Sequence, residues 1–153
     1  MQTFIIKTQA DMDRMMADVR AAFERLTWEP FLQSEMRLME AAHAGYWLSQ
    51  AGPSGTPWPA LAASTVRRKG HATILVDKTP LRNSLTMPYG GGLRFTVDEW
   101  PLARIQFGTD VPYSRYHNEG GGRLPKREHV GLTLPHFEGM VPRALDYALG
   151  QLA

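Results

Sequence analysis

The stretch GPSGTPWPAL, residues 52–61, separates a long helical pattern from a region of different periodicity and so decides the organisation of the fold. Its three prolines fix their own backbone angles and disfavour helix at the residues before them, while its two glycines accept angles that other residues resist. We therefore predict an ordered loop that no helix crosses. The large apolar surface of Trp58 then pins the loop either to the protein's own core or to a partner.

Two amphipathic helices are predicted before this loop, after a short strand over residues 3–7. Thr8 and Asp11 form a capping pair for the first helix, and Pro30 suits the first turn of the second, which should end near Gly52. Apolar positions recur at helical spacing in both: Met12, Met15, Met16, Val19, Phe23 and Leu26, then Leu32, Met36, Met39, His43, Tyr46 and Trp47. Such stripes are ordinarily core, and the alternative for Met-rich ones is a flexible partner groove.

After the loop, residues 61–69 are predicted to form a short helix that Gly70 closes. The apolar period then changes to two, which predicts three antiparallel strands in a β-meander, within residues 81–87, 93–97 and 103–107. The glycines at 90–92 separate the first two strands, and a turn over 98–101 joins the second to the third.

Three more elements are predicted toward the C-terminus. A helical turn over 113–118 stops at the glycines 120–122, and a last strand follows within 124–132. A terminal amphipathic helix over 137–152 places Pro142 in its first turn, so we expect it to begin near Gly139. The chain of 153 residues is predicted to be one α+β domain, with a helical part at 1–51, an ordered loop at 52–60, and the sheet and C-terminal helix at 61–153.

Composition narrows the function classes. With no Cys, the chain has no disulfides, thiolate metal sites or Cys nucleophile. The apolar run at residues 4–6 is too short for a signal peptide and no stretch approaches a membrane span, so we expect a soluble protein made in the cytoplasm and no membrane partner. Residues 61–153 carry twelve basic against eight acidic groups, which leaves nucleic-acid binding as an alternative, although the basic residues form no stripe.

Signs of catalysis are weak. Serines 64, 84 and 114 lack the GxSxG elbow of a hydrolase, and neither glycine run has the Lys-Ser/Thr ending of a P-loop. His117, Glu119 and His129 carry ligand types suitable for zinc, but their spacing matches no strong zinc signature, so a metal-dependent hydrolase is a second alternative. We expect no enzyme, no cofactor and no metal.

The ordered motifs WPAL with a following RRKG, then ILVDKTPLRNSL, YSRYHNEGG and REHVGLT, resemble the Mu-type phage virion morphogenesis family, the tail completion proteins. The similarity covers about residues 45–150. Matching positions are Trp58, Leu61, Thr65, Leu75, Leu81, Arg82, Ser84, Tyr113, His117, Gly120, Arg127, Gly131 and Leu132. The resemblance implies a structural protein at the head-proximal end of a phage tail, a ring of identical subunits with a hexamer as one expected size.

By the same resemblance, the expected partners are the tail tube and the head-tail connector proteins, and the expected location is the virion neck, or the host cytoplasm during assembly, encoded by a phage or a prophage. A ring needs one patch on each subunit that fits a different patch on the next, and aromatic loops and Arg side chains suit such contacts. We therefore predict interface residues at the following positions: Trp58, Tyr113, Arg115, Tyr116, His117, Arg123 and Arg127.

Overall fold

The computed structural model describes residues 8–99 and 102–152 and has an α+β fold, as predicted. Helices dominate, and the strands form one antiparallel hairpin. The elements in chain order are α1 (Gln9–Glu24), α2 (Glu29–Ser49), α3 (Ala63–Lys69), α4 (Pro80–Thr86), β1 (Leu93–Glu99), β2 (Leu102–Gly108), α5 (Ser114–Glu119) and α6 (Leu134–Leu152).

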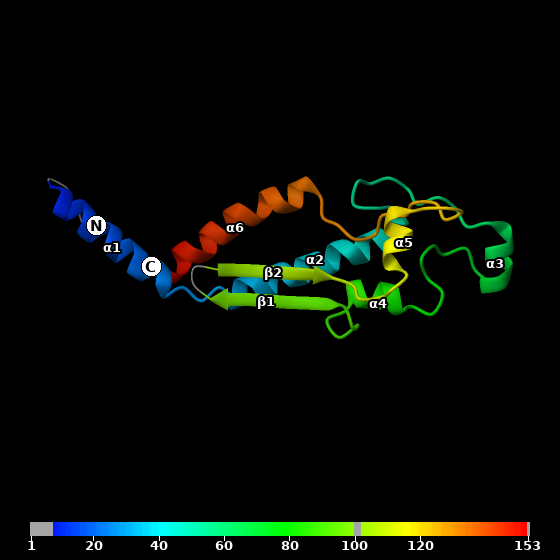
Figure 1. The fold of residues 1–153 in the computed structure, drawn as a ribbon, viewed down its shortest axis with the longest axis horizontal. Coiled ribbons are helices and arrows are strands. Elements are labelled where there is room, and N and C mark those ends of the chain that lie inside the picture. The colour runs from blue at the N-terminus through cyan, green and yellow to red at the C-terminus, as the bar shows by residue number, and fades with distance from the viewer. Residues whose placement is uncertain (1–7, 100–101, 153) are drawn as a thin grey trace.

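Helix α2 is the axis of the molecule, with contacts to β1, β2, α4 and α6 (Figure 1). Pro30 lies in its first turn, as predicted, where its missing N–H leaves no hydrogen bond unmade. The helix is capped by Gln50, whose positive φ of 53° turns the chain into the loop. Its predicted apolar face is confirmed by the burial of Leu32, Met36, Met39, His43 and Trp47.

Strands β1 and β2 confirm two of the three predicted meander strands. They pair in antiparallel register from Leu93 opposite Gly108 to Glu99 opposite Leu102. The last two residues of the predicted turn, 100 and 101, lie outside the described residues, and so does the strand predicted over 3–7.

The strand predicted within 81–87 is wrong, because residues Pro80–Thr86 form helix α4. Pro80 stands in the first turn, where proline favours helix. Leu81 and Leu85 are four apart, which puts them on one face of a helix as readily as on one face of a strand, and both are buried. The glycines after α4 permit close packing, since a Cβ at Gly90 would overlap the Asn83 carbonyl.

The hydrophobic core lies where the 52–61 loop meets α2 and α4. It is built from Trp47, Trp58, Ile74, Leu81 and Leu85. The rings of Trp47 and Trp58 meet edge to face at 5.5 Å, a favoured arrangement of aromatic pairs. The loop is ordered, as predicted, and Trp58 is only 5% exposed, so it pins the loop to the body. The place of Trp58 at or near an interface stays a prediction, because burial within a single chain does not test it.

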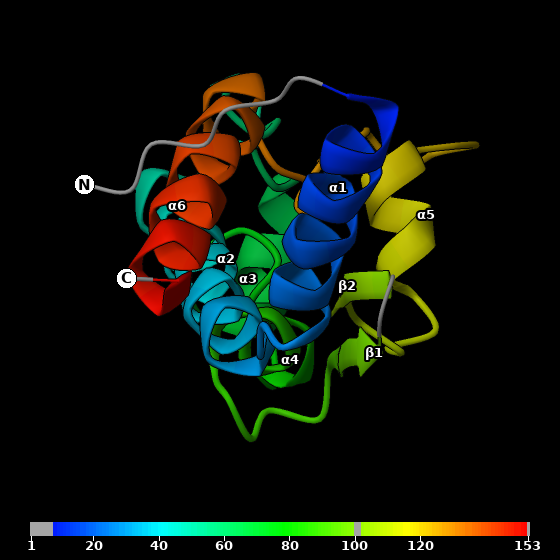
Figure 2. The same ribbon diagram turned by 90° about the vertical axis from the view of Figure 1, so that its left-hand side faces the viewer.

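Helix α1 begins with the predicted cap: Thr8 and Asp11 bond reciprocally to each other's backbone amides. The core interpretation of its Met-rich stripe is wrong, because no residue of α1 is buried. Figure 1 shows why: α1 projects beyond the end of the hairpin, and in Figure 2 it stands in front of the body.

Helix α6 begins at Leu134, five residues before the predicted start. Pro135 lies in the first turn of the helix, a position that proline favours, and Pro142 lies inside the helix. Side chains fasten α6 to α2: Arg143 donates two hydrogen bonds, of 2.6 and 2.7 Å, to the fully buried carboxylate of Glu35.

The strand predicted within 124–132 is also wrong; the segment forms only an isolated bridge between Gly121 and Leu124. Among the described residues, no helix combines the length and apolarity that crossing a membrane requires.

Candidate interaction site

Arg127 clamps the segment 124–132 to the 52–61 loop. Its guanidinium donates to the carbonyls of Pro59, at 2.9 Å, and Ala60, at 3.1 Å, while its backbone N–H donates to the His117 carbonyl at 2.7 Å. Trp58 adds a bond from its indole N–H to the Glu128 carbonyl, at 2.7 Å. Arg127 is itself buried, so its first role is to hold two loops together rather than to present a free guanidinium.

Asn118 explains why the 124–132 segment does not need a partner strand. Its side-chain Oδ1 accepts hydrogen bonds from the backbone amides of His129, at 2.9 Å, and Val130, at 3.0 Å. A buried amide must find an acceptor, and here one side chain on α5 takes the place of a strand's carbonyls. The segment is therefore held in place without being the strand that the sequence predicted.

Ser114 and His129 form a buried pair that the sequence analysis missed. Since the Arg127 carbonyl only accepts, His129 Nδ1 must carry the proton it donates over 2.8 Å, which leaves Nε2 to accept from the Ser114 hydroxyl at 2.9 Å. Burial lowers the pKa of His129, so the ring stays neutral. A serine hydrogen-bonded to a histidine resembles the activated nucleophile of an enzyme. Here, however, His129 is fully buried, and its Nδ1 is oriented by a backbone carbonyl instead of a carboxylate. The pair therefore serves to fasten α5 to the 124–132 segment.

His43 fastens the same segment to α2. Its Nδ1 donates to the Met39 carbonyl at 2.7 Å, so its Nε2 is free to accept from the Gly131 amide at 3.4 Å. The ring packs against Phe107, with centroids 4.7 Å apart. Burial is the main cause that lowers the pKa of His43 to about 4, and the nearby Arg94 lowers it further.

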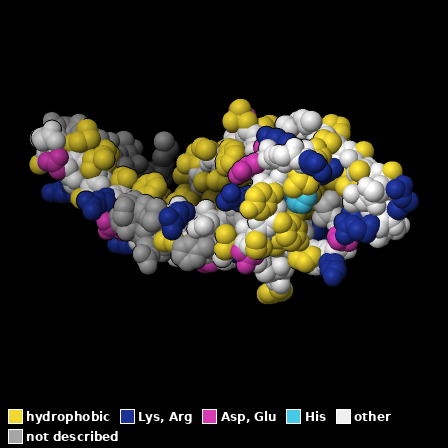
Figure 3. All heavy atoms as spheres, turned by 45° about the vertical axis from the view of Figure 1, so that its right-hand side comes forward, with side chains coloured by type: hydrophobic (Ala, Val, Ile, Leu, Met, Phe, Trp, Pro, Cys, Tyr) yellow, Lys and Arg dark blue, Asp and Glu magenta, His cyan; other side chains and the backbone are white. Residues whose placement is uncertain are grey.

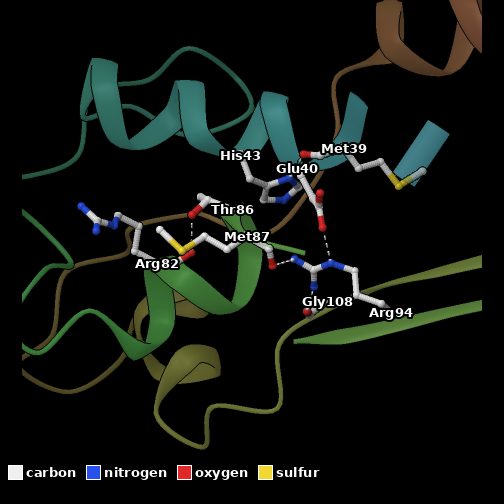
Figure 4. Close-up of polar contacts among 8 residues, drawn as sticks. All are labelled: Met39, Glu40, His43, Arg82, Thr86, Met87, Arg94 and Gly108. Atoms are coloured by element: carbon white, nitrogen blue, oxygen red, sulfur yellow. Dashed lines mark hydrogen bonds and ion pairs between the residues drawn. The ribbon is translucent and has the colours of Figure 1, made fainter. Parts of the chain in front are cut away.

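Close by, Arg94 reaches from β1 to Glu40 on α2 (Figure 4). Its Nε lies 2.8 Å from the carboxylate, and its other nitrogens donate to the carbonyls of Gly108 and Met87. Both side chains are largely buried, and the guanidinium stacks 4.4 Å above the Phe107 ring. This ion pair fixes the hairpin on α2.

A cavity of about 420 Å³ opens beside the Arg127 clamp. It lies between α3, the turn before α4 and the start of α5. Its lining residues are Leu61, Thr65, Arg68, Lys69, Leu75, Val76, Asp77, Lys78, Thr79, Pro80, Leu81, Tyr113, His117 and Arg127. Its charged side chains are four cations and one carboxylate, so the lining is basic and partly apolar. In Figure 3, Lys and Arg side chains lie along the whole of the face in view, including the end of the molecule that carries α3.

The structure divides the seven predicted interface residues into three groups. Tyr113, His117 and Arg127 meet at the cavity. Arg115 and Tyr116 are exposed on α5, where the guanidinium lies 5.2 Å from the centre of the Tyr116 ring, and Arg123 is exposed in the glycine loop. Trp58 is in the core.

The sequence did not predict that three more cations, Arg68, Lys69 and Lys78, line the cavity together with Arg127. Arg68 and Lys69 lie at the end of the short helix predicted over 61–69, and Lys78 lies nine residues further on in the turn before α4. Only the fold brings the two segments together. Among the described residues, no group of three His, Cys, Asp or Glu side chains is placed to hold a metal ion.

A second surface consists of two apolar stripes that meet water. The α1 stripe contains Met12, Met16 and Val19. The α6 stripe contains Leu134, Phe137, Val141, Leu145, Leu149 and Leu152. Met16 is 56% exposed and Val141 is 70% exposed, which is unusual for apolar residues that recur on one helical face.

Known proteins supply no closer guide to the function: the chain matches no protein-family model, no curated protein and no solved structure. The resemblance to the tail completion family therefore stays a prediction.

Proposed function

We propose that this chain is a non-enzymatic structural protein that joins copies of itself into a ring, and that the ring completes the head-proximal end of a phage tail. The observation that carries the self-association is that one chain presents two different apolar stripes, on α1 and α6, and that residues 8–99 and 102–152 cover neither. The place in the tail rests on the resemblance of the 45–150 region to the tail completion proteins.

The α1 stripe indicates a binding partner, because α1 makes few other contacts that would stabilise it. A helix of 16 residues is close to the length at which an isolated helix is marginal in water. Its capping box and the Arg20–Glu24 pair, at 2.9 Å, contribute only local stabilisation. An apolar surface that receives the α1 stripe would supply what the helix lacks.

The α6 stripe has the dimensions of such a receiving surface. Helix α6 has 19 residues and so extends for about 28 Å, against about 24 Å for α1. Its inner face is already engaged, since Arg143 bonds to Glu35 and Ala148 is buried. The outer face is therefore the one available, and its stripe runs the full length of the helix.

A second copy of the chain is the occupant that we propose. Two different patches that fit each other produce a head-to-tail interface, and such interfaces close into rings when the rotation permits. Residues 25–28 connect α1 to α2 so that α1 points away from its own α6, as Figures 1 and 2 show, whereas the α6 of a neighbour is not limited by that connection.

A mixing experiment tests the pairing. Met16→Glu places a charge in the α1 stripe and Val141→Glu places one in the α6 stripe, and each variant alone should be monomeric by light scattering. Each keeps the stripe that the other has lost, so an equal mixture should form a heterodimer and nothing larger. Arg14→Glu, on the exposed polar side of α1, is the matched control and should assemble like the original chain.

A mixture that stays monomeric would contradict the pairing of α1 with α6.

A second experiment tests the proposed place in the tail: the assembled protein is added to purified tails and imaged by negative stain. Density at one tail end supports the proposal. Uniform binding along DNA that weakens steeply with salt would instead favour the nucleic-acid alternative.

A further inference from the structure

The basic cavity beside Arg127 contains more positive charge than the chain neutralises. Arg68, Lys69, Lys78 and Arg127 line it against a single carboxylate, Asp77. That carboxylate lies 3.9 Å from Arg68, which is a long and exposed ion pair. Within the described residues, no carboxylate comes within ion-pair distance of Lys69, Lys78 or Arg127, so the lining has three cations without a direct counterion.

Some of these cations donate hydrogen bonds to backbone carbonyls, which are neutral and so leave the positive charge uncompensated. Arg127 donates to two backbone carbonyls, and Lys69 Nζ donates to the Thr73 carbonyl at 2.7 Å. Burial, followed by the nearby Arg127, lowers the pKa of His117, and the Nδ1 of that ring is buried without a hydrogen-bond partner in the described structure. An anion in the cavity would gain from the cations and could accept from this histidine.

The apolar part of the cavity lining indicates which class of ligand would bring a negative charge into it. Leu61, Leu75, Val76 and Leu81 supply apolar walls, and Tyr113 stands at the edge, 44% exposed. A phosphodiester backbone presents charge along its whole length and is bound by cations spread over an open surface. A pocket with few polar groups and apolar walls fits a short segment that carries one or two carboxylates among apolar side chains.

We propose that this cavity is a docking site for an acidic, partly apolar segment of a partner protein, whose carboxylate is held by Arg68 and Lys78, while the buried Arg127 adds positive charge beside it. The cavity uses no residue of the α1 or α6 stripe, so the site stands independently of the ring. The bound carboxylate neutralises the cations, and the apolar side chains beside it cover Leu75 and Tyr113. The aromatic and Arg residues at the edge are of the types that dominate binding energy at interfaces.

The test uses a labelled, capped peptide of alternating glutamate and leucine, titrated with the full chain and followed by fluorescence anisotropy. Lys78→Gln and Arg68→Gln should each weaken binding by about fivefold to tenfold, as expected for loss of one hydrogen bond of ordinary net strength. Arg67→Gln is the matched control, because Arg67 is exposed on the same helix α3 but does not line the cavity, and binding should stay within about twofold. Asp77→Asn removes the only lining carboxylate and should tighten binding.

Three results would overturn the proposal. Equal binding of the glutamine counterpart of the peptide would mean that the cavity does not recognise charge. Binding of inorganic phosphate without binding of the peptide would make it a simple anion site. Single-stranded DNA that binds more tightly than the peptide and responds to the same substitutions would assign the cavity to nucleic acid.

Discussion

The interior around α2 and the outer faces of α1 and α6 differ in whether their side chains have partners within the chain. In the interior, buried charges have partners: Glu35 is held by Arg143, and Glu40 by Arg94. On the outer faces, apolar side chains such as Met16 and Leu145 lie in water although they recur at helical spacing. One region is complete within a single chain, whereas the other becomes complete only when something covers it. Function should therefore be sought on the incomplete faces, and stability in the complete interior.

The largest effect should come from the interior. Trp58→Ala removes a ring that packs on Trp47 and donates to the Glu128 carbonyl, so it leaves both a cavity and an unpaired acceptor. We expect the free energy of unfolding to fall by about 3–5 kcal/mol, measured by denaturant unfolding followed by circular dichroism. Tyr89→Ala is the control: that side chain is 99% exposed, so stability should change by less than about 0.5 kcal/mol.

A Trp58→Ala protein that keeps its stability but fails to assemble would instead assign Trp58 to the predicted interface. Sequence alone left this choice open, because a tryptophan in a proline-rich loop has the same pattern whether it faces the core or a partner. The deciding contact is with Glu128, seventy positions further along the chain. No local pattern contains that information.

Local signals predicted what depends on local physics. The cap at Thr8, the proline start of α2 and the left-handed Gly70 after α3 were all visible, since each satisfies helix-end groups within a few residues. The failures share one cause. Leu81 and Leu85 fit two periodicities, and the burial of 124–132 depends on Asn118. In both places the partner that selects the structure lies elsewhere in the chain.

The candidate site follows the same division. Tyr113 and His117 were predicted together because both belong to the YSRYHNEGG motif of the resemblance, and their rings lie 6.2 Å apart at the start of α5. Lys78 was not, because only the turn before α4 brings it to them. The exposed α1 stripe was predicted as core for a related reason: an amphipathic pattern shows that a helix has an apolar face, but not whether the same chain covers it.

A smaller effect on the interior should appear as the pH is lowered. The pKa of His43 is about 4 in the folded protein and about 6.5 when unfolded, so the unfolded chain binds the extra proton first. The stabilisation is complete above about pH 6.5 and is lost as the pH falls toward 4, by about 3 kcal/mol. Burial shifts the pKa of His129 in the same direction, so the two add.

Denaturant midpoints between pH 7 and pH 4 measure this loss. His43→Leu removes the titrating ring while keeping an apolar side chain beside Phe107, so its stability at neutral pH should be lower but should depend less on pH. An unchanged pH dependence in that variant would show that other groups, and not His43, take up the proton.

The smallest effect on the single chain, and the sharpest contrast with Trp58, is expected from Val19→Ser on α1. Val19 is exposed, so at concentrations where the chain is monomeric its removal should change the free energy of unfolding by less than about 0.5 kcal/mol. Association stabilises the folded state by mass action, so the melting temperature of the original chain should rise with protein concentration. In Val19→Ser that rise should be weaker, because the α1 stripe has lost one of its three apolar contacts. A scan of melting temperature against protein concentration measures the stability of the single chain and the contribution of association together. The interior sets the melting temperature at low concentration, and the stripes set how steeply it rises with concentration. Equal slopes for the two proteins would mean that the α1 stripe is not part of the interface.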